Sequence, residues 1–242
     1  MSRLLEVRAI GKRFGGLQAL ADVSFEVDEG EIVGVIGPNG AGKTTLFNVI
    51  TGYEAPDTGA IVLRGAAITA WPPHRICRLG IARTFQISKP FANLSVLEAV
   101  RIGALNRVRT MPAATARALE ILDLLGLAAK RDQLGRHLTV AERKRLELAR
   151  ALATAPSLLL MDEVAAGLRP GEVQDMITLV RGIAARGVTV LIIEHVLEAV
   201  MRLSGRIVVL NHGQGIAEGP PGSLVNDPRV IEAYLGEAYQ LA

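Results

Sequence analysis

The feature that most constrains the fold is a short apolar run followed at once by a glycine-rich segment. Ile32 to Ile36 reads Ile-Val-Gly-Val-Ile, and Gly37 to Thr44 reads Gly-Pro-Asn-Gly-Ala-Gly-Lys-Thr. A continuous apolar run of this length is typical of a strand buried on both faces of a parallel sheet. The glycines let backbone N–H groups curl around an anion at the start of the next helix. The segment therefore matches the full pattern of a phosphate-binding loop between a strand and a helix.

Two side chains at the end of this loop specify the kind of phosphate ligand. Lys43 is placed to reach the β and γ phosphates of a nucleotide, and the Thr44 hydroxyl is placed to bind Mg²⁺. A chance glycine-rich turn is the alternative, and the strand-to-helix context argues against it. The predicted nucleotide-binding residues of the loop are Gly37, Pro38, Asn39, Gly40, Ala41, Gly42, Lys43, Thr44 and Thr45.

A second apolar run ends in two acids. Leu158 to Met161 reads Leu-Leu-Leu-Met, and Asp162 and Glu163 follow it. Because ligands of open α/β sheets bind at the carboxyl ends of the strands, Asp162 is predicted to be a second Mg²⁺ ligand. Attack on a γ-phosphate needs a positioned water, and Glu163 is predicted to orient or deprotonate it. A solvated turn with two adjacent acids is the alternative.

A histidine follows a third apolar run. Val188 to Ile193 is of strand length, and Glu194 and His195 come directly after it. Since separate strand ends meet at one crevice of such a sheet, His195 is predicted to reach the γ-phosphate or the attacking water. A structural or surface histidine is the alternative.

The order of the segments predicts one domain with a helical part in its middle. Half of the 242 residues are hydrophobic and 4% are aromatic, which favours an aliphatic α/β core. Strands and turns fill the first 65 residues, and Ile81 to Phe85 is predicted as a further strand. We expect a nucleotide-binding lobe of residues 1–87 and 154–242 around a helical subdomain of residues 88–153. Later predicted elements are a helix over Val173 to Ala185, a hairpin of Ile207 to Leu210 with Ile216 to Glu218, and a helix near Val230 to Leu235.

Composition excludes several other classes. The single cysteine, Cys77, cannot form a disulfide or a cysteine zinc site within one chain, and we expect it to be buried. A net charge of +3 is far below what nucleic-acid binders concentrate on one face, so no nucleic-acid partner is expected. No secretory signal is expected at the N-terminus, and no apolar run approaches the ~18 residues of a membrane span. Any link to a membrane is expected to pass through another protein.

Two further segments complete an ordered set of motifs. They are Lys12-Arg13-Phe14-Gly15-Gly16 and Thr84-Phe85-Gln86. With the motifs above, they resemble the ATP-binding subunits of ABC transporters over nearly the whole chain. The resemblance implies that Phe14 stacks on adenine, although a core position is its alternative, and that Gln86 touches Mg²⁺ and responds to a transmembrane subunit.

The same resemblance implies an overall fold and a set of catalytic roles. The fold is an α/β P-loop ABC ATPase with a mostly parallel core sheet, an antiparallel β subdomain and a helical signature subdomain. The cofactors are ATP and Mg²⁺. The implied catalytic residues are Glu163, His195, Gln86 and Lys43, and the implied metal ligands are Thr44, Gln86 and Asp162.

Three stretches resemble one group within this family. Phe14 to Leu17, Ala82 to Gln86 and Asp227 to Gly236 are similar to the branched-chain (hydrophobic) amino-acid uptake group, and the lipopolysaccharide-export and urea-uptake ATPases share parts of the pattern. The resemblance implies transmembrane permease subunits, a second ABC ATPase in a homodimer or heterodimer, and indirectly a solute-binding protein. It also implies a peripheral position on the cytoplasmic face of the inner membrane.

The family signature Leu-Ser-x-Gly-Gln is altered in this chain. It reads Leu138-Thr139-Val140-Ala141-Glu142, and the resemblance implies that Thr139 and Ala141 contact the γ-phosphate held by the opposite subunit. The same residues predict a capping box between Thr139 and Glu142, and both interpretations can hold together. The charged run over residues 143–150 is predicted to be a solvated face and a domain contact.

A second departure supports an alternative function. Arg169 stands where the family usually has Asp or Asn in a loop that crosses the dimer interface, which suggests a partner ATPase of different sequence. With the altered signature, it favours a regulatory subunit with weakened hydrolysis as the alternative to a working motor. Soluble ABC proteins of DNA repair or translation carry coiled coils or a second cassette, and small P-loop kinases lack the ordered motifs.

Overall fold

The structure is a computed structural model that describes residues 2–85, 91–194 and 197–239. The described residues form a six-stranded sheet in the order β10-β9-β3-β8-β7-β6, in which β9, β3, β8, β7 and β6 run parallel and β10 pairs antiparallel with β9. This arrangement confirms the mostly parallel core sheet. Its strands are β3 (Ile32–Ile36), β6 (Ile81–Arg83), β7 (Leu158–Asp162), β8 (Thr189–Ile193), β9 (Arg206–Asn211) and β10 (Gln214–Gly219).

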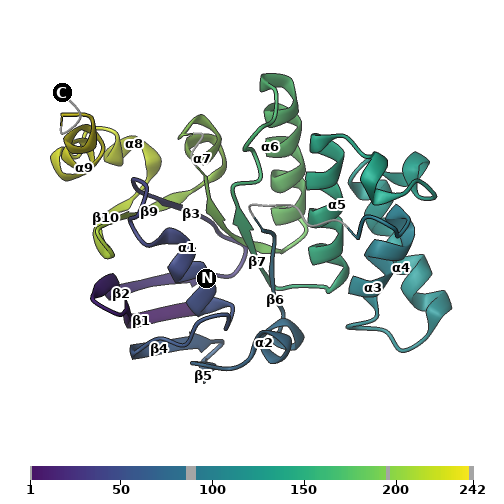
Figure 1. The fold of residues 1–242 in the computed structure, drawn as a ribbon, viewed down its shortest axis with the longest axis horizontal. Helices are drawn as coiled ribbons and strands as arrows, with labels where there is room; N and C mark the ends of the chain where they lie inside the picture. Colours follow the sequence, from purple (N-terminus) through teal and green to yellow (C-terminus); the bar gives the residue numbers. More distant parts are fainter. Residues whose placement is uncertain (1, 86–90, 195–196, 240–242) are drawn as a thin grey trace.

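The N-terminal third forms a separate antiparallel sheet in the order β2-β1-β4-β5. Helix α1 (Lys43–Ile50) lies between this sheet and the core sheet (Figure 1), and Leu46 and Phe47 are fully buried there. The phosphate loop leads directly into α1, so both sheets fix the position of the loop. The strands are β1 (Arg3–Phe14), β2 (Leu17–Asp28), β4 (Thr58–Leu63) and β5 (Ala66–Ala67).

The central strands are buried on both faces, as their unbroken apolar runs predict. Leu158 and Leu160 of β7 pack in the core beside α1, whereas Leu159 and Met161 face the core beside α5 and α6. One strand end differs from its prediction: β6 stops at Arg83 rather than at Phe85. The Phe85 N–H leaves the sheet and donates to the Glu147 carboxylate at 2.9 Å, which ends the ladder.

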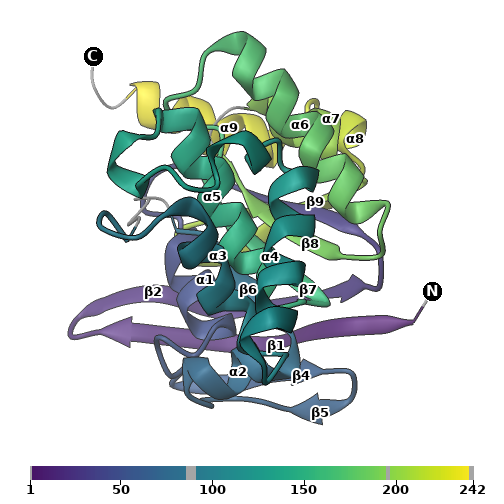
Figure 2. The ribbon, with the colours of Figure 1, turned by 90° about the vertical axis from the view of Figure 1, so that its right-hand side faces the viewer.

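The middle of the chain is helical and stands at one end of the core sheet, in front of the strands in Figure 2. Three α-helices, α3 (Val96–Ala104), α4 (Met111–Leu124) and α5 (Val140–Ala153), pack in one core with α6 (Pro170–Ala184). Short 3₁₀ turns cover Ala128–Lys130 and Gly135–His137. The remaining helices of the described residues are α2 (Pro73–Leu79), α7 (Leu197–Leu203), α8 (Pro221–Leu224) and α9 (Pro228–Tyr239), of which only α9 was predicted.

Two predictions about side-chain exposure are wrong, the first of them only in its solvated part. The charged run at 143–150 is not a solvated face throughout, because Lys144 and Glu147 are buried and form hydrogen bonds with backbone groups that replace water. Cys77 is half-buried rather than buried. No helix within the described ranges combines the length and the apolar content that a membrane span requires.

Gly103 allows α3 to approach α5 closely. A Cβ at this position would lie 2.5 Å from the Arg150 carbonyl oxygen and 3.0 Å from the Ala153 Cβ. Gly103→Ala is therefore expected to lower the free energy of unfolding by about 1–3 kcal/mol, measured by urea denaturation.

The matched control is Gly182→Ala in α6, where the added Cβ would meet the end of the flexible Arg186 side chain at 3.5 Å. This variant is expected to be more stable by about 0.5–1 kcal/mol, because alanine favours a helix interior. Equal effects of the two substitutions would show that α3 and α5 are not in tight contact at Gly103.

Candidate functional site

A pocket joins the phosphate loop to residues from the β1–β2 hairpin and from the end of β7. Elements far apart in the sequence therefore meet at one place, as the strand-end argument predicts. The pocket is lined by Phe14, Leu17, Gln18, Ala19, Asn39, Gly40, Ala41, Gly42, Lys43, Thr44, Thr45 and Glu163.

The loop needs glycine at two positions for reasons of space and backbone conformation. Gly37 has φ 152°, and a Cβ there would lie 2.0 Å from the Leu210 carbonyl oxygen. Gly42 has φ 99° and precedes α1, and a Cβ there would lie 2.5 Å from the Ala19 carbonyl oxygen. Larger residues would push the loop away from β9 and β2.

Lys43 is buried within the loop. Its ammonium donates hydrogen bonds to the carbonyl oxygens of Gly37 at 2.6 Å and Pro38 at 2.8 Å. Lys43 is the first residue of α1, so its ammonium and the N–H groups of the helix N-terminus both favour a phosphate there.

Phe14 forms the edge of the pocket at the end of β1. Its ring is 44% exposed, and the Lys12 ammonium lies 5.3 Å from the ring centroid. An exposed aromatic face beside a phosphate loop suits the stacking of a planar base. The ring is therefore not a core residue.

Asp162 is 2% exposed and has one engaged and one unengaged oxygen. Its Oδ2 accepts a hydrogen bond from Arg83 Nη2 at 2.7 Å, whereas its Oδ1 has no hydrogen-bond partner among the described residues. Its backbone N–H donates to Thr84 Oγ1 at 3.2 Å, which fixes the end of β7 to β6. A buried carboxylate oxygen without a partner is costly unless a cation binds there.

The residues present fit Mg²⁺ bound together with a phosphate ligand. Thr44 offers a hydroxyl and Asp162 a carboxylate oxygen, and Mg²⁺ prefers such ligands and completes its shell with phosphate and water. Within the part of the chain that the structure describes, no three His, Cys, Asp or Glu side chains are grouped to hold a metal. With Thr44 and Asp162 as protein ligands, phosphate and water would complete the shell, so the site suits a metal that arrives with its nucleotide.

Glu163 has a strained backbone that several groups stabilise. It is 8% exposed, and its φ of 50° is unusual for a residue with a Cβ and costs about 1–3 kcal/mol. Its N–H donates to the Ile193 carbonyl at 2.9 Å, and its carbonyl accepts from Lys144 Nζ at 2.7 Å. The side chain lines the same pocket as Lys43 and Thr44.

Glu194 is a buried acid next to this turn that sequence reasoning did not assign a role. It is 4% exposed, its Oε1 accepts from the Ala165 N–H at 2.7 Å, and its Oε2 has no partner among the described residues. Burial raises the pKa of the Glu194 carboxyl to about 7, an effect opposed by the Ala165 N–H and the Lys144 ammonium and reinforced by the Glu163 carboxylate. Its position directly after β8 was the one feature of the sequence that could have indicated a role for Glu194.

Comparison with known proteins decides the family. A model described as "ABC transporter" matches residues 20–166, and one described as "Branched-chain amino acid ATP-binding cassette transporter" matches residues 216–240. This chain belongs to the ABC transporter family of ATP-binding cassettes. The predictions of the fold and of an ATPase are thereby confirmed.

Curated relatives and solved structures match the cassette over nearly its whole length. The high-affinity branched-chain amino acid transport ATP-binding protein LivG of Salmonella typhimurium is 39% identical, covering 97% of this chain and 98% of that protein. The lipopolysaccharide export system ATP-binding protein LptB of Acidithiobacillus ferridurans is 37% identical, covering 100% of both. A crystal structure of an ABC transporter cassette in its ADP conformation is 35% identical, with a TM-score of 0.89, covering 98% of this chain and 100% of that one.

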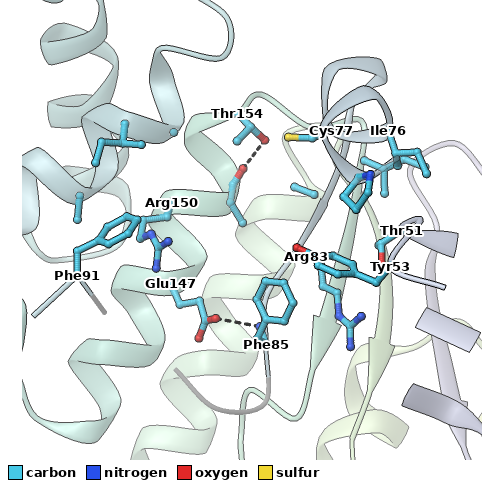
Figure 3. Close-up of a pocket in the computed structure, with 17 residues that line it drawn as sticks. Thr51, Tyr53, Ile76, Cys77, Arg83, Phe85, Phe91, Glu147, Arg150 and Thr154 are labelled. Atoms are coloured by element: carbon cyan, nitrogen blue, oxygen red, sulfur yellow. Dashed lines mark hydrogen bonds between the residues drawn. The ribbon is translucent and has the colours of Figure 1, made fainter. Parts of the chain in front are cut away.

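The cassette has a second hollow, hereafter the cleft, between α2 and β6 on one side and α3 and α5 on the other (Figure 3). Figure 3 places Phe85 and Arg83 on one side and Phe91 and Arg150 on the other, with Glu147 between them. The Arg150 guanidinium lies 4.4 Å from the Phe91 ring centroid, and Tyr53 meets Phe85 edge to face at 5.7 Å. Exposed apolar residues of the cleft are Tyr53, Phe85, Phe91 and Ile102.

The altered signature forms the predicted capping box at the start of α5. The Glu142 N–H donates to Thr139 Oγ1 at 3.3 Å, and the Thr139 N–H donates to Glu142 Oε2 at 2.9 Å. Glu142 is also paired with Lys130, whose hydrogen bond lowers the pKa of the Glu142 carboxyl. Neither Thr139 nor Ala141 is among the described residues that line the phosphate-loop pocket.

The cassette brings together part of the predicted site. Phe14, Glu163 and the loop from Asn39 to Thr45 line one pocket, and Gly37 and Pro38 hold Lys43. Gln86 and His195 lie outside the described residues, so their roles stay predictions. Arg169 is exposed in the loop before α6.

The raised pKa of Glu194 gives a pH test of the buried turn. The folded value of about 7 exceeds the ordinary value of 4.5, so the folded chain binds more protons between these values and loses stability as the pH rises. Glu194→Gln keeps an acceptor for the Ala165 N–H but carries no charge. Its free energy of unfolding is expected to rise relative to the original chain, by on the order of 3 kcal/mol between about pH 4 and pH 8.

Urea denaturation over this pH range measures the difference. Glu198→Gln is the control, because Glu198 is an exposed acid in α7 whose ion pair with Arg202 lies on the surface. Parallel stability curves for Glu194→Gln and the original chain would contradict the raised pKa.

Proposed function

We propose that this cassette is the ATP-hydrolysing subunit of an ABC importer for branched-chain or other hydrophobic amino acids, or a related small solute. The observation that carries the ATPase mechanism is the single pocket that contains Phe14, the phosphate loop and Glu163. In this proposal adenine stacks on Phe14, and Lys43 and the loop N–H groups hold the phosphates.

Hydrolysis requires a water aligned with the γ-phosphate and compensation of the charge that develops there. Glu163 accepts the proton of that water or orients it, and its strained backbone fixes where the carboxylate stands. Lys43 stabilises the developing charge. Mg²⁺, bound by Thr44 and Asp162, would supply neutralising charge at the phosphates; Gln86 and His195 are proposed to act at the same end.

The proposed amino-acid substrate is inferred from the names of similar proteins. LivG proteins of Salmonella typhimurium and Escherichia coli, a BraF protein and a protein named as probable LivG of Archaeoglobus fulgidus carry names for branched-chain amino acid transport, at 37–39% identity. The C-terminal match at residues 216–240 bears the same description. Lipopolysaccharide export is the second candidate, because LptB is 37% identical over the whole chain.

Transport requires membrane partners, and the cleft is the surface proposed to receive them. Its exposed rings lie beside the buried carboxylate of Glu147 and the buried guanidinium of Arg83. This combination suits a short helix with apolar side chains and polar ends. We propose that permease subunits insert such a segment here, placing the cassette peripherally on the cytoplasmic face of the inner membrane. A solute-binding protein would act through the permeases.

A second ATPase subunit is proposed to complete the nucleotide site. Thr139 and Ala141 stand at the N-terminus of α5 outside the phosphate-loop pocket, which is consistent with contact to the nucleotide of a partner. Exposed Arg169 favours a partner of different sequence. In this proposal residues 1–87 and 154–242 bind nucleotide, and residues 88–153 carry the motion to the permeases.

Substitution of the proposed base separates binding from hydrolysis. Glu163→Gln is expected to lower ATP turnover by about 100-fold or more, because the amide cannot accept the proton, while ATP affinity stays within about threefold. Phosphate release by the complex that a tagged full chain recovers from solubilised membranes, and fluorescent-nucleotide binding by the purified full chain, measure the two effects. Glu120→Gln on the exposed face of α4 is the control, and equal turnover in all three proteins would remove Glu163 from the mechanism.

Substitution in the cleft tests the permease contact. Ile102 and Met111 are both 49% exposed, but only Ile102 lies among the described residues of the cleft. Ile102→Glu is expected to lower the share of tagged chain recovered with membranes at least about tenfold, because it places a charge in the apolar contact. Met111→Glu is expected to leave recovery unchanged. Equal recovery of both variants would assign the cleft another role.

A further inference from the structure

Arg83 connects three parts of the cassette, and nothing in the proposed mechanism uses it. Its Nη1 donates to the Asn48 Oδ1 in α1 at 2.6 Å, and its Nη2 donates to the Asp162 Oδ2 at the end of β7 at 2.7 Å. The side chain is 6% exposed, so both bonds are shielded from water. A planar guanidinium held by acceptors on two elements has a fixed orientation.

This orientation determines which oxygen of Asp162 is available. An arginine often binds both oxygens of a carboxylate, but here the second donor arm goes to Asn48. The Oδ1 of Asp162 is therefore left buried and without a partner among the described residues. Arg83 places a positive charge against the Oδ2 of the buried Asp162 and leaves the Oδ1 for Mg²⁺.

The same guanidinium belongs to the cleft. Arg83 lines the cleft, and its guanidinium carbon lies 5.1 Å from the centroid of the Phe85 ring and 5.5 Å from that of Phe47. Phe85 is 41% exposed in the cleft, whereas Phe47 is buried in α1. A group that displaces the Phe85 ring removes one of the two aromatic supports of Arg83.

We infer that Arg83 is a positioning residue that holds Asp162 for Mg²⁺, and through which an occupant of the cleft acts on the metal site. The second part rests on the proposed function of the cleft, and the first does not. If the ion pair between Arg83 and Asp162 were only structural, its loss would lower the stability of the fold. It would not change the Mg²⁺ concentration at which half of the Mg²⁺-dependent gain in nucleotide affinity is reached.

The first test uses the purified full chain and a fluorescent ATP analogue, titrated with Mg²⁺ and measured separately in EDTA. Arg83→Gln is expected to raise the half-saturating Mg²⁺ concentration at least about tenfold, as loss of an outer-shell partner does at other metal sites. The affinity in EDTA is expected to stay unchanged, and Arg83→Lys, which keeps the charge, is expected to recover part of the loss.

Two further variants keep this test decisive. Arg206→Gln is the control, because Arg206 forms an ion pair with Glu31 at the amino end of the core sheet, and its Mg²⁺ titration is expected to match the original chain. If Arg83→Gln does not fold, Asn48→Ala removes only the other anchor and is expected to shift the titration in the same direction. An unshifted titration in Arg83→Gln, or in Asn48→Ala where Arg83→Gln does not fold, would overturn the positioning role.

The link to the cleft has its own pair of variants. Phe85→Ala removes the ring beside Arg83, whereas Phe91→Ala removes an equally exposed ring that lies against Arg150. In the isolated chain Phe85→Ala is expected to raise the half-saturating Mg²⁺ concentration, and Phe91→Ala is expected to raise it less. Equal shifts would overturn the link but leave the permease proposal standing, because no permease is present in this assay.

Discussion

The rest of the site depends on the buried charges at the carboxyl end of β7. Asp162 is held through its side chain by Arg83 of β6, and Glu163 is held through its backbone carbonyl by Lys144 of α5. A buried charge without a partner is costly, so these contacts oblige β6, β7 and α5 to keep their mutual positions. Two cations therefore fix the end of β7, from which Glu163 lines the phosphate-loop pocket.

The helix α5 is common to the surroundings of the nucleotide pocket and to the cleft. The helix α5 starts at the altered signature, carries Lys144 against the Glu163 turn, and places Glu147 and Arg150 in the cleft. A shift of α5 relative to β7 would strain the Lys144 bond and the already strained Glu163 backbone together. The signature and two residues of the cleft thus lie along α5, and the backbone of the proposed base is bonded to the same helix.

Sequence reasoning predicted the local features well and the long-range pairings poorly. The run Ile32 to Ile36, the loop after it and the Thr139 capping box are encoded by neighbouring residues, and the structure contains the strand, the helix start and the cap. The contact between Arg83 and Asp162 spans 79 residues and has no periodic signal. Lys144 seemed solvated because a helical pattern does not reveal that a charge will meet a backbone carbonyl.

The most direct test of this account is a structure of the full-length Glu163→Gln variant with ATP and Mg²⁺. The account predicts adenine on Phe14, phosphates on Lys43 and the loop, and the metal at Thr44 and the Oδ1 of Asp162, with Arg83 still on the Oδ2. Nucleotide bound elsewhere, or a metal away from Asp162, would contradict it.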